Sequence, residues 1–492
     1  MKKRIVYIVS YFLLLLTLFV CQKPFFMLYN DAAEKGALFS DFFRVMGNGI
    51  SLDATTAGYL TALPFLMVLI SIWVKKFPLR KILLPYYIIA SLLVAVVFVV
   101  DMGLYPFWGF KLDASIFLYL DSPKEAMASV SFGFILLRVV AMLMLTTFYV
   151  WLMCKVTPHQ LEVTAKRIGG TLGMLFLGGI LFIIIRGGVT ESTSNVGQVY
   201  FSNNQFLNHS AVNPCFSLLS SMGKSKDFAS EFNFFEEEKR AKLVEGLYPT
   251  SDGDSLKQVL TTNCPNVLLI LMEGFGGAFI EPLGGLPDVA PNLNRLSEEG
   301  IFFTHCYANS FRTDRGTVCT LSGYLGLPTV SVMKIPTKSR TLPAISEELV
   351  KAGYQTDFLY GGDINFTNMK SYLLSKGYQH LTADTDFSLA ERNSNVWGVN
   401  DDITSEWLLN HLKQRSDKET PWFTTYLTLS SHEPFDVPYS RLEEKIPNAF
   451  AYTDECLGKL IEGLKQTPLW KDLLIVCIPD HGFCYPQGTT DR

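Results

Sequence analysis

Five long apolar segments near the N-terminus constrain this chain more than any other feature. They cover residues 5–20, 54–74, 82–100, 129–153 and 169–185. Each is close to the roughly 20 residues that a helix needs to cross a bilayer. The pattern predicts a five-helix transmembrane bundle over residues 1–186. The first segment follows a basic stretch, as in a signal peptide, but no small-residue cleavage site comes after it, so we expect an uncleaved anchor.

The basic residues near the spans fall in alternate loops. One set precedes the first span, one lies between the second and third, and one lies between the fourth and fifth: Lys2, Lys3 and Arg4; Lys75, Lys76, Arg80 and Lys81; Lys155, Lys166 and Arg167. The other loops are mainly acidic, with Asp31, Glu34, Asp41, Asp53, Asp101, Asp113 and Asp121. The positive-inside rule then predicts a multi-pass protein of the cell (inner) membrane, with a cytoplasmic N-terminus and an extracytoplasmic C-terminal part.

Beyond the spans, the composition changes twice. Residues 187–262 are polar and carry a charged run at 236–240, which predicts a linker over the membrane surface that includes a solvated helix. From residue 263 apolar strand patterns at 266–272, 355–360, 422–429 and 473–478 alternate with helical patterns at 291–299 and 344–351. This alternation predicts an α/β domain over 263–492 with a mostly parallel sheet. Lys and Arg total 42 against 46 Asp and Glu, with no basic tail, so no nucleic-acid partner is expected.

Polar residues follow two of the predicted strands. Glu273 comes directly after the first strand, and Asp480 and His481 follow the last. Ligands bind beyond the carboxyl ends of parallel strands, so we expect these side chains at one edge of the sheet. Two carboxylates and a histidine can hold a divalent cation, with manganese expected and zinc or magnesium as alternatives. The alternative is a helix cap and a turn without a ligand.

A second group of polar residues lies at 310–317. Within it, Arg312 could bind phosphate oxygens as a planar fork, and Thr313 or Thr317 could supply a nucleophilic hydroxyl. A threonine hydroxyl attacks poorly unless a cation or a base activates it. A solvated loop with a capping threonine remains the other interpretation.

Several motifs together resemble the lipoteichoic-acid-synthase-like phosphoglycerol transferases of the alkaline phosphatase/sulfatase superfamily. They are residues 266–274, 291–293, 311–328 and 479–482, arranged in order behind five spans. The resemblance implies that Glu273, Thr313, Asp480 and His481 bind the metal and that Thr313 is the nucleophile. Thr313 is preferred to Thr317 because it aligns residues 326–328 without a gap and places Arg312 at the family's basic position. His432, within Ser431-His432-Glu433-Pro434, matches a substrate-side histidine, although a turn histidine would look the same.

The chain departs from the resembled family in the headgroup pocket. The family's His, Trp and Arg appear here as Tyr360, Thr367 and Met369. Asp363 and Asn365 are candidate replacements, although loop residues of this kind are usually structural. Family members also continue beyond the Asp480-His481 motif, so the C-terminal part is expected to be incomplete.

The resemblance implies a transferase that moves a phosphoglycerol-type headgroup from an outer-leaflet phospholipid to an acceptor hydroxyl of a glycan, glycerol phosphate or lipid. A phospho-threonine intermediate is expected. Phosphoethanolamine transfer is the nearest alternative. A sulfatase is disfavoured because no C-x-P-x-R motif occurs, and a non-catalytic membrane sensor because Glu273, Thr313 and Asp480-His481 are all present.

Overall fold

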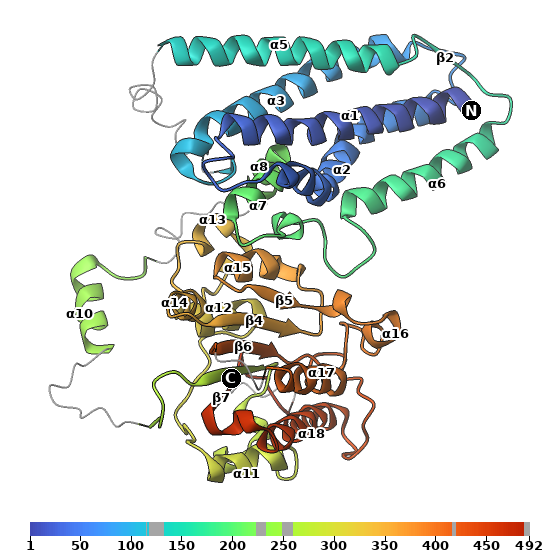
Figure 1. The fold of residues 1–492 in the computed structure, drawn as a ribbon. Helices are drawn as coiled ribbons and strands as arrows, with labels where there is room; N and C mark the ends of the chain where they lie inside the picture. Colours follow the sequence, from blue (N-terminus) through green and yellow to red (C-terminus); the bar gives the residue numbers. More distant parts are fainter. Residues whose placement is uncertain (115, 118–131, 223–232, 248–258, 416–419, 487–492) are drawn as a thin grey trace.

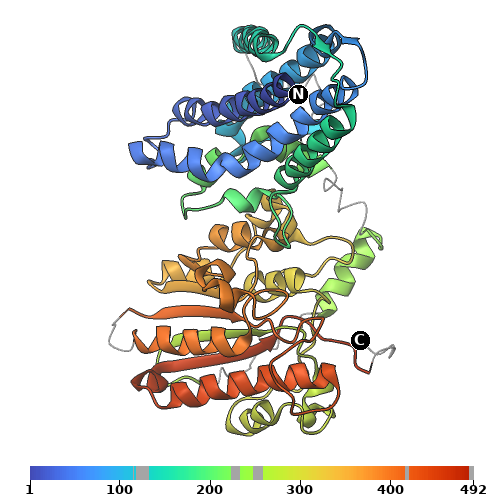
Figure 2. The same ribbon diagram turned by 90° about the vertical axis from the view of Figure 1, so that its right-hand side faces the viewer.

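The computed structural model describes residues 1–114, 116–117, 132–222, 233–247, 259–415 and 420–486. Long helices form one part of the molecule, and an α/β domain forms the other (Figure 1). Figure 2 shows the same two parts from the side, joined by the linker that leaves the last long helix.

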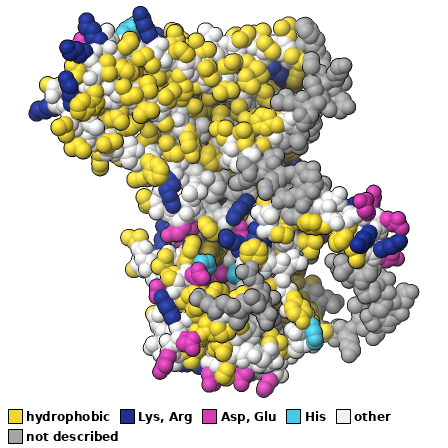
Figure 3. All heavy atoms as spheres, turned by 180° about the vertical axis from the view of Figure 1, so that it is seen from behind, with side chains coloured by type: hydrophobic (Ala, Val, Ile, Leu, Met, Phe, Trp, Pro, Cys, Tyr) yellow, Lys and Arg dark blue, Asp and Glu magenta, His cyan; other side chains and the backbone are white. Residues whose placement is uncertain are grey.

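Within the described residues, five helices are long and apolar enough to cross a membrane. They are α1 (Lys2–Tyr29), α2 (Phe39–Ile70), α3 (Leu79–Trp108), α5 (Phe132–Val156) and α6 (Arg167–Arg186). Their outward side chains are mostly hydrophobic, so the bundle surface in Figure 3 is largely apolar, with Lys and Arg gathered at one end. The predicted fold class, an apolar helix bundle followed by an α/β domain, is therefore confirmed. The fourth span was predicted from residue 129, and residues 129–131 lie outside the described part.

The loops predicted as basic lie together at that end of the bundle. Strand β1 (Lys76–Phe77) pairs antiparallel with β2 (Leu161–Glu162), which joins the loop before α3 to the loop before α6. The guanidinium of Arg4 donates to the backbone oxygens of Ser71, at 2.8 Å, and Glu162, at 2.6 Å. Three stretches far apart in sequence therefore share one end, as the charge pattern requires.

Three acidic residues predicted to lie in loops, Asp41, Asp53 and Asp101, are instead buried in helices, and two of them have buried cationic partners. Asp53 in α2 binds Lys23 of α1 at 2.7 Å, and Asp101 in α3 pairs with Lys111. The helices extend past the apolar runs because each of these two carboxylates has a buried cationic partner, so the bundle tolerates charges that hydropathy alone excludes.

The linker joins the bundle to the α/β domain, and its first elements lie between these two parts, whereas its last helix stands beside the α/β domain (Figure 1). It contains η2 (Val196–Val199), α7 (Gln205–Ala211), α8 (Pro214–Met222) and α10 (Glu237–Leu247). The Asn213 side chain donates to Asp53 of α2 at 2.9 Å, and Arg340 of the α/β domain donates to the carbonyl oxygen of Gly109, just after α3, at 3.1 Å. The charged run predicted as a helix lies in α10, where the side chains are exposed.

A five-stranded parallel sheet forms the centre of the α/β domain. Its order is β5-β4-β6-β3-β7, with β3 (Asn266–Met272), β4 (Gln355–Tyr360), β5 (His380–Thr382), β6 (Trp422–Leu427) and β7 (Leu473–Pro479). Its α-helices are α11 (Pro291–Glu299), α12 (Thr313–Ser322), α13 (Pro336–Ser339), α14 (Ile345–Lys351), α15 (Met369–Ser375), α16 (Leu389–Arg392), α17 (Asp401–Lys413) and α18 (Lys445–Lys465). Short 3₁₀ turns connect them: η3 (Gly277–Phe279), η4 (Glu281–Leu283), η5 (Val332–Lys334), η6 (Phe366–Asn368), η7 (Asp384–Asp386) and η8 (Pro468–Asp472).

Alternate residues of β3 face opposite sides of the sheet, as strand geometry requires. Leu268 and Ile270 pack with α17 and α18, whereas Leu269 and Leu271 pack with α12 and α15. Both faces are therefore covered by helices, which explains the nearly continuous apolar pattern of this strand.

Most predicted element bounds agree with the structure within two residues. The strand predicted at 422–429 ends at Leu427. The next residue, Thr428, lies beyond the strand, and its hydroxyl accepts a hydrogen bond from the N–H of Glu273 at the end of β3. The helix predicted at 344–351 begins at Ile345.

Candidate metal-binding and active site

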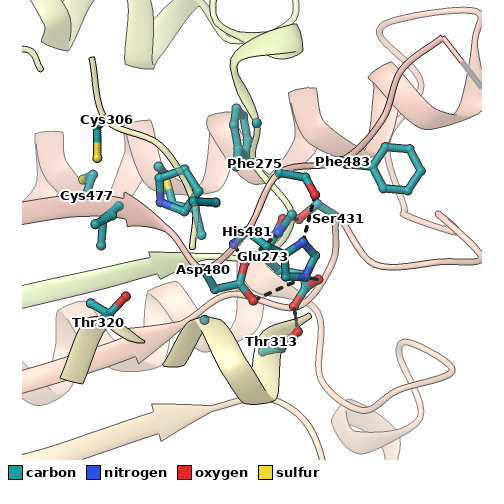
Figure 4. A pocket seen from close by; sticks show the side chains of 18 of the residues that line it. Glu273, Phe275, Cys306, Thr313, Thr320, Ser431, Cys477, Asp480, His481 and Phe483 are labelled. Atoms are coloured by element: carbon teal, nitrogen blue, oxygen red, sulfur yellow. Dashed lines mark hydrogen bonds and ion pairs between the residues drawn. The ribbon is translucent and has the colours of Figure 1, made fainter. Parts of the chain in front are cut away.

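Four side chains predicted from separate stretches meet at the carboxyl edge of the sheet. Glu273 follows β3, Asp480 and His481 follow β7, and Thr313 begins α12. Figure 4 shows the four pointing toward one another. The neighbouring strands β3 and β7 run parallel in register, from Asn266 opposite Leu473 to Met272 opposite Pro479, so their ends bring the acidic residues together.

The four side chains are within or near hydrogen-bond distance. The Thr313 hydroxyl donates to Glu273 Oε2 at 2.8 Å. His481 Nε2 lies 3.4 Å from Glu273 Oε1 and 3.6 Å from Asp480 Oδ2. Figure 3 shows histidine and acidic side chains side by side on one face of this domain.

Close backbone packing holds α12 against the end of β7. A Cβ atom on Gly316 would stand 2.0 Å from the carbonyl oxygen of Asp480, so only glycine fits there. Gly274 adopts a left-handed φ of 61°, and its N–H donates to Asp480 Oδ1 at 2.9 Å. These two glycines let the nucleophile candidate and the carboxylates approach one another.

Two hydroxyl residues that the sequence reasoning missed position Glu273. The Glu273 N–H donates to Thr428 Oγ1 at 2.9 Å, and Ser431 Oγ donates to the Glu273 carbonyl at 2.7 Å. Both follow β6, the strand next to β3, so their place at a strand end was a signal that could have identified them.

Burial and mutual charge shift the pKa values of the three ionisable groups. Burial and the nearby Glu273 raise the pKa of Asp480 to about 7. Burial alone would lower the pKa of His481, but its hydrogen bond to Glu273 and the charge of Asp480 raise it to about 9. Burial alone would raise the pKa of Glu273, but His481 outweighs it and lowers that pKa. The raised pKa values of Asp480 and His481 show that the two carboxyl groups favour positive charge at this position, whether from protons or from a cation.

The residues fit a divalent cation. One ligand atom from each of Glu273, Asp480 and His481 can be chosen so that all lie within 4.8 Å of one another. Asp480 Oδ2 is buried with no hydrogen-bond partner, a costly arrangement unless a ligand satisfies it. His481 Nδ1 lies 2.9 Å from the carbonyl oxygen of Gly482, which favours hydrogen on Nδ1, so a cation that displaced the Nε2 proton could bind that nitrogen.

A cleft of about 1780 Å³ opens over the four residues. Arg312 lines it, is exposed, and has no side-chain hydrogen bond or ion pair among the described residues. His432 also lines it, with its ring centroid 4.7 Å from that of Trp397 and the two rings tilted by 57°, and its Nδ1 lies 2.8 Å from the carbonyl oxygen of Glu433. Arg312 and His432 therefore share the cleft with Thr313.

The family model for Sulfatase matches residues 265–490. Residues 265–490 form a sulfatase-family domain. Curated relatives named phosphoglycerol transferase I match it: one from Salmonella arizonae is 24% identical over 222 residues, and one from Escherichia coli is 25% identical over 220. Each alignment covers 40% of this chain and 28% of the relative.

Solved structures similar to the sulfatase-family domain include a protein of the alkaline phosphatase superfamily from Vibrio parahaemolyticus. It is 26% identical, with a TM-score of 0.46, over 52% of this chain and 66% of that one. The lipoteichoic acid synthase LtaP from Listeria monocytogenes is 18% identical, with a TM-score of 0.42, over 45% and 57% of the two chains.

Three of the residues predicted from the sequence lie away from the cluster of Glu273, Thr313, Asp480 and His481. Asp363 Oδ1 accepts hydrogen bonds from the backbone and side chain of Asn365, at 2.9 and 3.1 Å, so the two residues shape their own loop. The described lining of the cleft omits both and includes Tyr360, Phe366, Thr367 and Met369 instead. Thr317 is fully buried one turn inside α12 and is absent from that lining.

Proposed function

We propose that the sulfatase-family domain transfers a phosphoglycerol-type headgroup from a membrane phospholipid to an acceptor hydroxyl through a phospho-threonine intermediate. One observation carries the proposal: Thr313 Oγ1 lies 2.8 Å from Glu273, within a buried set of metal-ligand side chains. The names of the phosphoglycerol transferase relatives support the choice of headgroup.

Glu273, Thr313, Asp480 and His481 would hold the divalent cation. Three oxygen donors and one nitrogen suit manganese, with zinc or magnesium as alternatives. A bound cation would stabilise negative charge on the phosphate and lower the pKa of the threonine hydroxyl.

The chain's own residues account for the proton movements. In the first half-reaction, Thr313 Oγ1 bonds to phosphorus, its proton passes to Glu273 Oε2, and the bond from phosphorus to the diacylglycerol oxygen breaks. His432 Nε2 protonates that leaving oxygen. In the second, an acceptor hydroxyl gives its proton to His432 and bonds to phosphorus, and Thr313 leaves and recovers its proton from Glu273.

Two further features suit a phosphate group. Arg312 can form paired hydrogen bonds to phosphate oxygens because its guanidinium is not engaged elsewhere in the described structure. Thr313 is the first residue of α12, a helix of 10 residues, so unpaired N–H groups and the positive end of the helix dipole lie beside the reacting atoms.

The membrane part fits a lipid donor. Residues 1–186 would anchor the enzyme in the inner membrane with a cytoplasmic N-terminus, and residues 263–492 would form an extracytoplasmic catalytic domain. Residues 187–262 would link these two parts. The shared basic end of the bundle supports this orientation. The acceptor would be a glycan, glycerol phosphate or another lipid.

Phosphoethanolamine is the alternative headgroup. Thr367 and Met369 line the cleft where the resembled family has Trp and Arg, and Phe366 and Trp397 form an edge-on aromatic pair beside them at 5.9 Å. Aromatic faces attract an ammonium group, which favours this alternative over a sulfate ester.

Release of diacylglycerol from phosphatidylglycerol or phosphatidylethanolamine, by the purified full chain with Mn²⁺, tests the proposal. Thr313→Ala should lower turnover by about 1000-fold or more because the nucleophile is lost. Thr341→Ala, which removes an exposed hydroxyl elsewhere in the domain, should match the wild type. Full activity in Thr313→Ala would refute the covalent mechanism, and the preferred lipid identifies the headgroup.

A further inference from the structure

The loop at residues 364–370, called the cleft loop below, lines one side of the cleft and has an unusual backbone. Thr367 and Asn368 are consecutive and both left-handed, with φ of 57° and 67°. Asparagine tolerates this region, but a β-branched threonine disfavours it, so surrounding contacts must hold the loop in shape. The neighbouring side chains of Phe366 and Met369 line the cleft with Thr367.

The linker supplies some of these contacts. The Asn195 side chain donates to the carbonyl oxygen of Asn365 at 2.9 Å, and the Gly197 N–H donates to Asn368 Oδ1 at 3.3 Å. A Cβ atom on Gly197 would stand 3.1 Å from the Cβ of Ser371, so η2 packs directly on the first turns of α15. Asn368 is buried in this contact.

On its other side, Asn368 reaches toward the nucleophile. Asn368 Nδ2 donates to the carbonyl oxygen of Lys334 at 3.3 Å, and Lys334 Nζ pairs with Asp314 Oδ2 at 3.0 Å. Asp314 is buried and follows Thr313 in sequence. A short series of contacts therefore joins the linker, the cleft loop and the start of α12.

The linker is itself fixed to the membrane helices. The Ser194 N–H donates to the carbonyl oxygen of Arg186, the last residue of α6, at 2.8 Å. Its hydroxyl lies 2.9 Å from that of Thr55 in α2. Figures 1 and 2 both place this linker between the long helices and α15.

We infer that residues 194–197 clamp the cleft loop, so that the membrane helices set the shape of the substrate cleft, with Asn368 as the main positioning residue. This inference rests on the proposed function for its effect on lipid turnover, although the clamp itself is a structural claim. The metal-binding side chains lie outside the loop and keep their own contacts.

Two variants remove the clamp from opposite sides. Asn368→Gly loses both side-chain hydrogen bonds while glycine accepts the left-handed φ, so the fold is kept. Asn195→Ala loses the hydrogen bond to the Asn365 carbonyl oxygen while every residue of the cleft loop itself is kept. The control, Asn393→Ala, removes an exposed asparagine whose amide donates only to the carbonyl oxygen of Leu389.

Hydrogen exchange and steady-state kinetics of the full chain test the inference. Both variants should exchange amides of residues 364–370 about tenfold faster, with exchange in β3 and α18 and the affinity for Mn²⁺ unchanged. KM for the lipid should rise about tenfold with kcat within twofold, because binding in the ground and transition states is weakened alike. The control should match the wild type.

Unchanged exchange of the loop in both variants would overturn the inference, and so would faster exchange throughout the domain, which indicates general destabilisation. The exchange result stands even if no lipid is turned over, so failure of the clamp and failure of the proposed function are distinguishable.

Discussion

Asp480 is the residue whose surroundings point most directly to a bound cation. Its side chain is buried, one oxygen accepts two backbone N–H groups, and the other has no hydrogen-bond partner among the described residues. A buried polar atom without a hydrogen bond lowers the stability of the folded state by about 1–3 kcal/mol, so this oxygen of Asp480 destabilises the fold when no cation is bound. Metal binding would recover that cost.

Asp480→Asn should weaken Mn²⁺ binding by about 100-fold, because the amide keeps the shape of the side chain but loses the charge that attracts the cation. Isothermal titration calorimetry of the full chain measures this affinity. Asp472→Asn, at an exposed carboxylate outside the cleft, is the matched control. An unchanged affinity in Asp480→Asn would remove Asp480 from the metal site.

The site residues differ in how well the sequence predicts them. Glu273, Asp480 and His481 were predictable because the ends of adjacent parallel strands must share an edge. Asp363 and Asn365 also follow a strand, but their side chains form a hydrogen bond with each other. The sequence pattern does not show whether a polar side chain after a strand points into the cleft or binds its own loop.

At the scale of elements, the contact between α12 and the end of β7 sets the geometry of the site. No side chain separates the two backbones at Gly316, where even one methyl group would overlap the carbonyl oxygen of Asp480. The helix therefore cannot move closer, and any substituent moves Thr313 away from Glu273.

Gly316→Ala should lower stability by about 1–3 kcal/mol and reduce turnover far more than the loss of folded protein explains, because it separates the nucleophile from the carboxylates. Thermal unfolding and turnover of the same preparation measure both effects. Gly300→Ala, where a Cβ would meet only an ordinary contact at 3.4 Å, should change neither by much. Normal activity in Gly316→Ala would contradict this account of the contact.

The five apolar spans and four of the five sheet strands were predictable from the sequence, whereas β5 and helices such as α17 and α18 were not predicted. Buried parallel strands appear as short apolar runs, which locate β3, β4, β6 and β7. Helix α2 begins 15 residues before the apolar segment that predicted it, since Asp53 is neutralised by Lys23, a partner that lies in another helix. Long-range pairing of this kind cannot be inferred from local hydropathy.

At the scale of the whole molecule, a buried histidine marks the junction between the bundle and the linker. His209 in α7 lies 3.0 Å from the hydroxyl of Tyr105 in α3. Burial and the nearby cations Lys111 and Arg340 lower its pKa to about 3, so the folded state requires the neutral ring. The unfolded value is near 6.5, so this contribution to stability is full above that pH and declines as the pH falls toward 3.

Lowering the pH from 7 to 5 should therefore reduce the free energy of unfolding of the wild type by about 2 kcal/mol through His209 alone. The His209→Asn variant should lack this contribution to the acid sensitivity. Thermal unfolding of the detergent-solubilised protein at both pH values measures the difference. His380→Asn, at an exposed position, is the control and should behave as the wild type does. Equal acid sensitivity of wild type and His209→Asn would show that other groups dominate.

The central claim is that Thr313 carries the transferred group, and the most direct test is the intact mass of the full chain after incubation with phosphatidylglycerol and Mn²⁺ without an acceptor. The account predicts a phosphoglycerol or, with phosphatidylethanolamine, a phosphoethanolamine adduct that peptide mapping places on Thr313 and that Thr313→Ala lacks. An adduct on another residue, or turnover of either lipid with no adduct under rapid quenching, would contradict it.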